Sequence, residues 1–534
     1  MTKSTSTMMT SFLSGQTDEQ KLTLHLLPAH NRIYRFGLSL IFLLGALTYI
    51  MTATTPAAAA ESTDSKGAST SESWRRTPPA LPQPRPFKLA DVTTYKLSNG
   101  LTVNLVEDHR VPFMTINLGI KAGSSFEPDN LHGVAGLTAD MITEGTARRS
   151  SKEIAEEIDF IGGALKGGSD YDFTLLIGSA LSKYADRLLD VVSDVVKNPS
   201  FPDNELTLKK TNLIQELVMK RSQPDFLSEE RFCQVVFGKH PYSVVAPQPE
   251  QVEKIQKKDL SDFHKKYYLP NEAVLIVVGD FKTADLKAVI EKSFGKDWSA
   301  GQLPQLQPPA PPQYTGKRIY LVNRPGSVQS CIKLGNIGIS KTDADYFPLM
   351  VANQILGGAA HSRLFLNIRE QKGYTYGAYS SYAARKQPGF FAAEAEVRTD
   401  VTGPSLQEFL YELERIRNLK ATDKELKDAK SYLVGSFALG LETQAGLAQR
   451  LLEVQLYDLP ADYLEKYSDK VMAVNLDEVR AVARKDIKLD NMTIVVVGDA
   501  DKVKQELEYF APVEMFETSG KPSGTGKSAT KPQS

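Results

Sequence analysis

The sequence predicts an α+β protein built from two homologous domains, and three observations support this. The chain has 534 residues, which is too many for a single hydrophobic core. A Pro-rich stretch, 302–316, separates two blocks of ordered sequence, 88–301 and 317–512. Each block closes with a strand that ends in Val-Val-Gly-Asp, at 277–280 and 496–499. A repeat of that length is typical of a duplicated domain rather than a solenoid.

Strands and helices mix within the first block. Asn99-Gly100 joins two alternating segments as a β-hairpin. Ser150 and Glu153 form a capping box for a helix that Gly162-Gly163 ends, and a strand follows over 171–181. A longer helix over about 204–221 has one apolar face, made of Leu206, Leu213, Ile214, Leu217 and Val218. Without strict strand–helix alternation, a layered α+β sandwich fits better than a doubly wound sheet.

Composition excludes some function classes. The formal net charge is −1, so nucleic-acid binding has no electrostatic support. The chain has only two cysteines, Cys233 and Cys331, which fall in different predicted domains. We expect two buried small hydrophobic residues there, although the sequence leaves a disulfide open. They form no metal site.

The N-terminus predicts export. Arg32 and Arg35 precede an uncharged apolar run, 36–53, and small residues follow at 57–60. This order is typical of a cleaved export signal over residues 1–60, which implies a periplasmic protein. The alternative is an uncleaved anchor in the inner membrane, because 36–53 is just long enough to span a bilayer. Residues 61–87 and 513–534 are predicted to be a disordered linker and a disordered tail.

The segment GVAGLTADMITEGT at 133–146 resembles the metal-binding helix of the pitrilysin/insulinase (inverzincin) family of zinc peptidases, with its ligands replaced. In that family an H-x-x-E-H motif places two histidines at i and i+4 and a glutamate base at i+3. The aligned positions here are Gly136 for the first histidine, Ala139 for the glutamate and Asp140 for the second histidine. The resemblance therefore points to the family and to the loss of its metal chemistry.

The resemblance covers nearly all of 88–512 and includes the hairpin at Asn99–Val103 and the segment 362–381. It implies two homologous α/β sandwich domains like those of the mitochondrial processing peptidase, related by internal duplication. The family's third zinc ligand falls on Glu216, for which a solvated helix glutamate is the alternative interpretation. Asp140 and Glu216 alone do not suit a catalytic zinc. The resemblance thus implies no cofactor in this chain and a zinc ion in a partner subunit.

Family members also use an arginine and a tyrosine, seven residues apart, to hold the substrate and stabilise the tetrahedral intermediate. Arg369 and Tyr376 have that spacing here. We expect Ser362 to cap a helix that carries Arg369 in its last turn, and Tyr376 to lie on the strand after it. Tyr374, predicted on the same strand face, is the rival for the tyrosine role. The alternative is that Arg369 complements the helix C-terminus and Tyr376 packs in the sheet.

A chain that keeps the Arg/Tyr pair and lacks the metal ligands resembles the non-catalytic subunit of heterodimeric members. We therefore expect an exported subunit that pairs with a homologous H-x-x-E-H zinc peptidase, supplies substrate-binding groups to unfolded peptides, and is active only in the complex. The alternative is a peptide- or protein-binding scaffold with no role in proteolysis. An independent hydrolase with an unusual metal has little support in the sequence.

Overall fold

The computed structural model describes residues 89–523. The predicted export signal, the linker over 61–87 and the end of the predicted tail lie outside the described residues. Within 89–523, none of the helices has both the length and the apolar character needed to cross a lipid bilayer.

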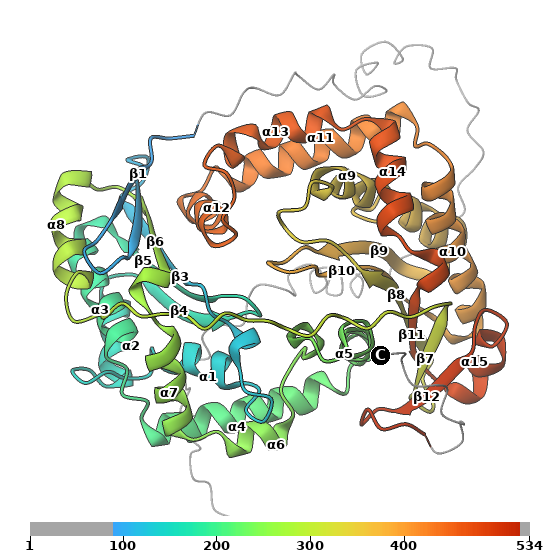
Figure 1. The fold of residues 1–534 in the computed structure, drawn as a ribbon, viewed down its shortest axis with the longest axis horizontal. Helices are drawn as coiled ribbons and strands as arrows, with labels where there is room; N and C mark the ends of the chain where they lie inside the picture. Colours follow the sequence, from blue (N-terminus) through green and yellow to red (C-terminus); the bar gives the residue numbers. More distant parts are fainter. Residues whose placement is uncertain (1–88, 524–534) are drawn as a thin grey trace, which may run out of the picture. The chain divides into compact units, whose positions relative to one another are not determined.

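The first half of the described chain forms a six-stranded mixed sheet with strand order β1-β2-β6-β3-β5-β4 (Figure 1). β2 and β6 are parallel, and the other neighbouring strands are antiparallel. Gly100 has a φ of 92°, which suits the turn between β1 and β2 and agrees with the predicted hairpin. The strands are β1 Thr93–Lys96, β2 Thr102–Glu107, β3 Phe113–Ile120, β4 Ala164–Ser169, β5 Thr174–Leu181 and β6 Ala273–Gly279.

The second half repeats this sheet with strand order β12-β7-β11-β8-β10-β9. Five strands correspond one to one, and β7 and β11 are parallel as β2 and β6 are, although β12 is also parallel to β7. Only the sixth, edge strand differs, because β1 starts the first half and β12 ends the second. The shared order confirms the predicted duplicated α+β fold. The strands are β7 Arg318–Asn323, β8 Gln329–Ile337, β9 Thr375–Ala383, β10 Phe390–Arg398, β11 Thr493–Gly498 and β12 Val513–Glu517.

Helices flank both sheets. Those of the first half are α1 Val134–Met141, α2 Ser151–Phe160, α3 Ala185–Lys197, α4 Asp203–Lys220, α5 Pro224–Phe237, α6 Pro249–Lys254, α7 Lys257–Tyr267 and α8 Thr283–Phe294. Those of the second half are α9 Tyr346–Leu356, the π-helix η6 Phe365–Gln371, α10 Thr402–Asn418, α11 Asp423–Gly440, α12 Gln444–Leu456, α13 Tyr463–Ala473, α14 Leu476–Asp486 and α15 Ala500–Leu507. The predicted capping box starts α2, since Ser150 and Glu153 each accept the other's backbone N–H.

Two helices pack on the sheet of the other half. α5 follows α4 in the first half but covers β8 and β11 of the second sheet, where its Phe232 is fully buried against Phe390. α12 follows α11 in the second half but covers β3 and β6 of the first sheet. Leu452 of α12 lies so close to β3 that a Cβ added at Gly119 would be 2.9 Å from its Cδ1. Each core therefore contains side chains from both halves.

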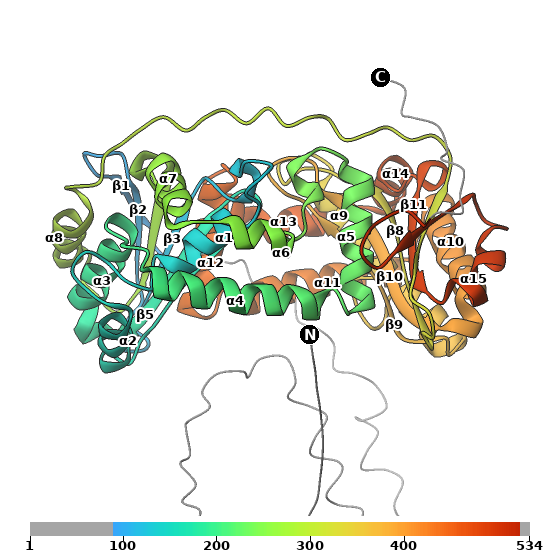
Figure 2. The same ribbon diagram turned by 90° about the horizontal axis from the view of Figure 1, so that it is seen from below.

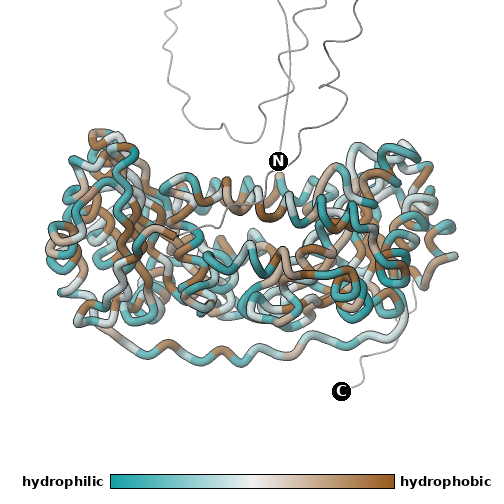
Figure 3. The backbone as a smooth tube through the Cα atoms, turned by 90° about the horizontal axis from the view of Figure 1, so that it is seen from above, coloured by the Kyte–Doolittle hydropathy of each residue, from teal (hydrophilic) through white to brown (hydrophobic). Residues whose placement is uncertain are grey.

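Between the two halves, residues 299–315 form neither helix nor strand. Figure 2 shows this segment running extended from α8 to β7, and Figure 3 shows short hydrophobic stretches alternating with hydrophilic ones along it. Proline lacks a backbone donor and favours extended conformations, so a Pro-rich sequence suits such a connection.

One detail of the helix predictions was wrong, and one strand was not predicted. Val218 was expected on the apolar face of α4, but its side chain is 62% exposed, while Leu206 and Leu217 are buried. The apolar face is narrower than predicted, with Leu213 and Ile214 partly buried beside those two leucines. β4 was not predicted, since its sequence, ALKGGS, contains two glycines and has no alternating apolar pattern.

Candidate functional site

The degenerate motif forms a short helix, α1, whose start is fixed by a side chain. The backbone N–H groups of Gly133 and Ala135 donate to the Glu127 carboxylate over 3.0 and 2.8 Å. A carboxylate at this end complements the positive helix N-terminus. Gly133 has a φ of 100°, a conformation that favours glycine. This segment therefore forms the kind of helix on which a metal-binding motif would have to lie.

The two faces of α1 differ in the space around them. At Gly136, a Cβ would meet no atom within 4 Å, and four residues later Asp140 is exposed. Ala139, between them, is fully buried. β4 approaches closely there, because a Cβ added at Gly167 would lie 2.0 Å from the Ala139 carbonyl oxygen. The positions aligned with two histidines are thus on the open side, and the position aligned with the base is on the packed side.

Asp140 lies among other charged groups. Although its side chain reaches solvent, desolvation by the surrounding protein raises the pKa of this carboxyl group. The positive charges of Lys209 and Lys166 oppose that shift, while Glu144 and Glu216 add to it. Of these groups, Asp140 lies on α1 and Glu216 on α4.

Glu216 itself is exposed and its carboxylate lies 2.8 Å from the Lys220 ammonium, one helical turn away. This is the environment of a solvated helix glutamate, which was the alternative interpretation of Glu216. No group of three or more His, Cys, Asp or Glu residues that could hold a metal is present among residues 89–523. The ligands of a catalytic zinc typically include imidazole groups. The aligned positions here supply a glycine, a buried methyl group and two carboxylates, one of them paired with lysine, and these do not match such a set.

Arg369 lies on η6, which is a π-helix instead of the expected α-helix. Its guanidinium stacks 4.6 Å from the Phe365 ring and lies 3.4 Å from the Glu370 carboxylate. Ser362 directly precedes the helical residues, and its carbonyl accepts from the Leu366 N–H over 2.9 Å. The predicted side-chain cap is absent, because the Ser362 hydroxyl is buried without a hydrogen-bond partner. Gly373 follows with a φ of 65°, as expected for a residue just after a helix. π-Helical turns are rare and often mark functional sites.

Tyr376 lies at a β-bulge in β9, the edge strand of the second sheet. The register pairs Ala378 with Ala395 but Thr375 with Val397, so β9 has one residue more than β10 here. A bulge of this kind changes which side chains share a face. It exposes 89% of Tyr376, on the same face as the exposed Tyr379.

Tyr374 differs from Tyr376 in environment. It precedes β9 and packs, partly buried, against the core of the second half. The prediction that the two tyrosines share a strand face was wrong because the alternation begins only at Thr375 and is then shifted by the bulge. Of the two, Tyr376 is the one whose hydroxyl is free to reach a ligand.

A cavity of about 730 Å³ lies between the start of α5 and the second sheet, and Tyr376 lines it. Its walls include three aromatic side chains, Phe226, Tyr376 and Tyr379. Arg369 does not line this cavity, but Phe365 connects the two, since its ring contacts both the Arg369 guanidinium and the Tyr379 ring. The two predicted residues are therefore on adjoining elements, η6 and β9, with no direct bond between them.

The floor of this cavity contains a charged group that the sequence interpretation missed. The Lys333 ammonium is buried and lies 2.5 Å from both Glu229 and Glu394. Burial lowers the pKa of Lys333, but the two carboxylates more than offset that effect and raise it. Desolvation and the nearby Asp225 raise the pKa of Glu396. A lysine within an otherwise apolar strand, SCIKLGNI, was the signal that could have indicated this group.

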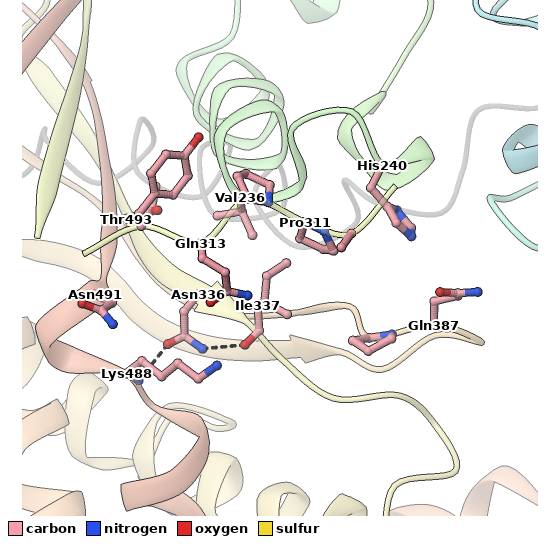
Figure 4. Close-up of a pocket in the computed structure, with 14 residues that line it drawn as sticks. Val236, His240, Pro311, Gln313, Asn336, Ile337, Gln387, Lys488, Asn491 and Thr493 are labelled. Atoms are coloured by element: carbon pink, nitrogen blue, oxygen red, sulfur yellow. Dashed lines mark hydrogen bonds between the residues drawn. The ribbon is translucent and has the colours of Figure 1, made fainter. Parts of the chain in front are cut away.

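A second, smaller cavity of about 180 Å³ lies where the Pro-rich segment passes over the second sheet. Figure 4 shows His240 and Gln387 at one end of it, Asn491 and Thr493 at the other, and Asn336 between them. Asn336 is held in place, because its amide donates to the Ile337 carbonyl and accepts from the Lys488 N–H. None of the residues predicted from the sequence lines this cavity, so it is not part of the candidate site.

Comparison with family models agrees with the duplicated fold. Residues 102–244 match the model described as insulinase (peptidase family M16), and residues 254–433 match the peptidase M16 inactive domain. The chain belongs to the insulinase (M16) family. Within that family it has the two-domain, half-size layout predicted from the sequence.

Two relatives from bacteria are similar over most of the chain. An uncharacterized zinc protease of Bacillus subtilis, YmxG, is 27% identical over 398 residues, which cover 74% of this chain and 95% of that protein. An uncharacterized zinc protease of Streptomyces coelicolor is 25% identical over 408 residues, which cover 75% of this chain and 88% of that protein. The chain thus spans nearly the full length of these two relatives.

Two solved structures have the same fold. The peptidase M16 inactive domain from Pseudomonas fluorescens has a TM-score of 0.70 and 28% identity, covering 76% of this chain and 98% of that one. A protease from Helicobacter pylori has a TM-score of 0.71 at 20% identity, covering 77% of this chain and 100% of that one. At that identity the second comparison supports the fold alone.

Proposed function

We propose that this protein is the non-catalytic subunit of an exported zinc metallopeptidase heterodimer that acts on unfolded peptides. The observation that carries the proposal is the contrast between its two halves. The metal-motif positions Gly136 and Ala139 have no donor side chain, whereas Tyr376 is exposed beside a large cavity. Membership of a peptidase family with a ligand-deficient first half favours a role that depends on a second subunit.

The partner would be a homologue with an intact H-x-x-E-H motif, and its zinc would activate water and polarise the scissile carbonyl. This chain would then contribute Arg369 and Tyr376. A guanidinium and a phenolic O–H are donors suited to a developing oxyanion. Arg369 is 42% exposed and Tyr376 is 89% exposed, so both can reach a bound peptide without rearrangement of the core.

Peptide binding is supported by the sheet edges. β4 and β9 are the last strands of their sheets, and an edge strand can accept an extended peptide through main-chain hydrogen bonds. β9 carries no charged residue from Thr375 to Ala383, and charge is one of the common devices that prevent edge pairing.

The test is to isolate the native protein from the envelope of its source organism and identify, by mass spectrometry, what co-purifies in equal amount. We expect a homologue that carries H-x-x-E-H. Cleavage of an unfolded reporter peptide should require both chains, and chelation of zinc should abolish it. Recovery as a monomer or a homodimer would reject the heterodimer and favour a peptide-binding scaffold.

A further inference from the structure

The π-helix η6 places one buried aromatic ring against Arg369. The Lys372 N–H donates to the Asn367 carbonyl over 3.0 Å, which is the i to i+5 bond of a π-turn. Such a turn is wider than the about 3.6 residues of an α-turn, so residues four apart lie more nearly one above the other. Phe365 and Arg369 are four apart, and the guanidinium carbon lies 4.6 Å from the centre of the Phe365 ring.

The Phe365 ring is itself held from the other side. It is only 4% exposed, and its centre lies 5.6 Å from that of the Tyr379 ring on β9, with the two planes tilted by 51°. Tilted aromatic pairs at this separation attract each other. Tyr379 lines the cavity beside Tyr376, whereas Phe365 does not. The ring is therefore a buried support between η6 and β9, and not a wall of the site.

The stack on Phe365 holds the Arg369 guanidinium better than its ion pair with Glu370 does. The two side chains of that pair are 42% and 53% exposed. Exposed ion pairs contribute little, because solvent screens them and two long side chains have to be ordered. The attraction between a cation and the face of a ring is stronger where water is excluded. The buried ring is therefore the contact that keeps this exposed arginine from adopting other rotamers.

We propose that Phe365 is a positioning residue for the reaction: its ring holds the Arg369 guanidinium beside β9, oriented toward the oxyanion that develops on the substrate. Phe365 touches no substrate and acts only through Arg369. A donor that is oriented in advance loses less freedom in the transition state, and this raises kcat. The inference rests on the proposed function, because it assumes the role given there to Arg369.

The first measurement uses the purified full-length chain alone and detects the side-chain Nε–H signal of Arg369 by NMR. An aromatic ring shifts the signals of protons that lie over its face, so this signal should be displaced from that of a free arginine. Arg369→Lys identifies the signal by removing it. Phe365→Leu should move the signal back to the position of a free arginine, and Phe365→Tyr, which keeps a ring, should not. An unchanged signal in Phe365→Leu would overturn the proposal.

The second measurement uses the complex with the zinc-bearing homologue. Phe365→Leu should lower kcat about tenfold and leave KM unchanged, because a guanidinium that moves freely stabilises the transition state less well. In an Arg369→Ala background the same substitution should have no further effect, since two residues that act as one unit are not additive. An equal loss of kcat in both backgrounds would show a merely structural role and overturn the proposal.

Phe294→Leu is the matched control. It removes a fully buried ring from α8 in the first half, and should change neither the Arg369 signal nor kcat. If Phe365→Leu does not fold, Phe365→Met replaces it, because methionine fills irregular space without a ring.

The inference and the proposed function fail in different ways. A wild-type complex that cleaves no peptide would overturn both. A complex that cleaves peptides, but in which Phe365→Leu acts independently of Arg369, would overturn the positioning role alone.

Discussion

At the scale of single residues, one extra residue in β9 decides which tyrosine faces solvent. The bulge opposite Glu396 places Tyr376 on the outer face, next to Tyr379, while Tyr374 remains packed against the core. The hydroxyl of Tyr376 is therefore available to a bound peptide. A bulge at a sheet edge is a common device for redirecting a side chain toward a functional site.

We predict that Tyr376→Phe lowers kcat/KM of the proposed heterodimer about 100-fold, because one donor to the transition-state oxyanion is lost. Tyr374→Phe is the matched control and should leave the rate unchanged. Size-exclusion chromatography would check that both variants still assemble. If the two substitutions reduced the rate equally, the hydroxyl of Tyr376 would have no special role in the reaction.

How far the sequence could predict this site differs from residue to residue. Two features depend only on residue identity, so the local sequence shows them. They are the spacing of Arg369 and Tyr376 and the loss of donors at Gly136 and Ala139. The π-helical turn and the bulge could not be predicted. The bulge is set by hydrogen bonds to another segment, namely by the pairing of β9 with β10.

At the scale of elements, the sequence gives the least information about α5 and α12, each of which covers the sheet of the other half. Cys233 on α5 and Cys331 on β8 were placed in different domains, yet both are buried free thiols in one hydrophobic cluster. Neither α5 nor α12 was predicted from the sequence, and periodicity would not have shown which sheet each of them covers. Helix amphipathicity specifies an apolar face and leaves its partner open.

The packing of α7 on α3 gives a pH-dependent prediction. His264 on α7 contacts the Val196 carbonyl, near the C-terminus of α3, over 2.7 Å, and burial lowers the pKa of His264 to about 4. The unfolded chain has a histidine pKa near 6.5 and so binds more protons below that pH. Stability should therefore fall, by about 3 kcal/mol at most, as the pH drops from about 6.5 to about 4.

The measurement is urea denaturation of the wild type and His264→Gln at about pH 7.5 and about pH 4.5. Glutamine can still donate to Val196 but does not titrate. The loss of stability between the two pH values should be smaller in the variant, by up to the same 3 kcal/mol or so. An identical loss in both proteins would show that His264 is not the responsible group.

At the scale of the whole molecule, the hairpin between β9 and β10 joins the two halves. The Tyr242 hydroxyl donates to the Asp172 carboxylate over 2.7 Å and accepts from the Gln387 N–H over 3.2 Å. The Lys386 N–H donates to the same carboxylate, and the Arg385 guanidinium lies 3.9 Å from the Tyr171 ring. β9, which carries Tyr376, is thereby held to the first half at the end opposite the bulge.

This contact makes a final prediction about how the halves are held together. Tyr242→Phe removes the hydroxyl between Asp172 and Gln387, and both are left short of a buried hydrogen bond. We expect the free energy of unfolding to fall by about 1–3 kcal/mol. Amide hydrogen exchange should become faster in the hairpin around Gln387 before it changes in β6 or β11, because the cores of both sheets are untouched. Tyr509→Phe, at an 83% exposed site, is the control. If exchange at the hairpin stayed at the wild-type rate, the Tyr242 hydroxyl would not be what holds it, and the contacts of Lys386 and Arg385 with the first half would suffice.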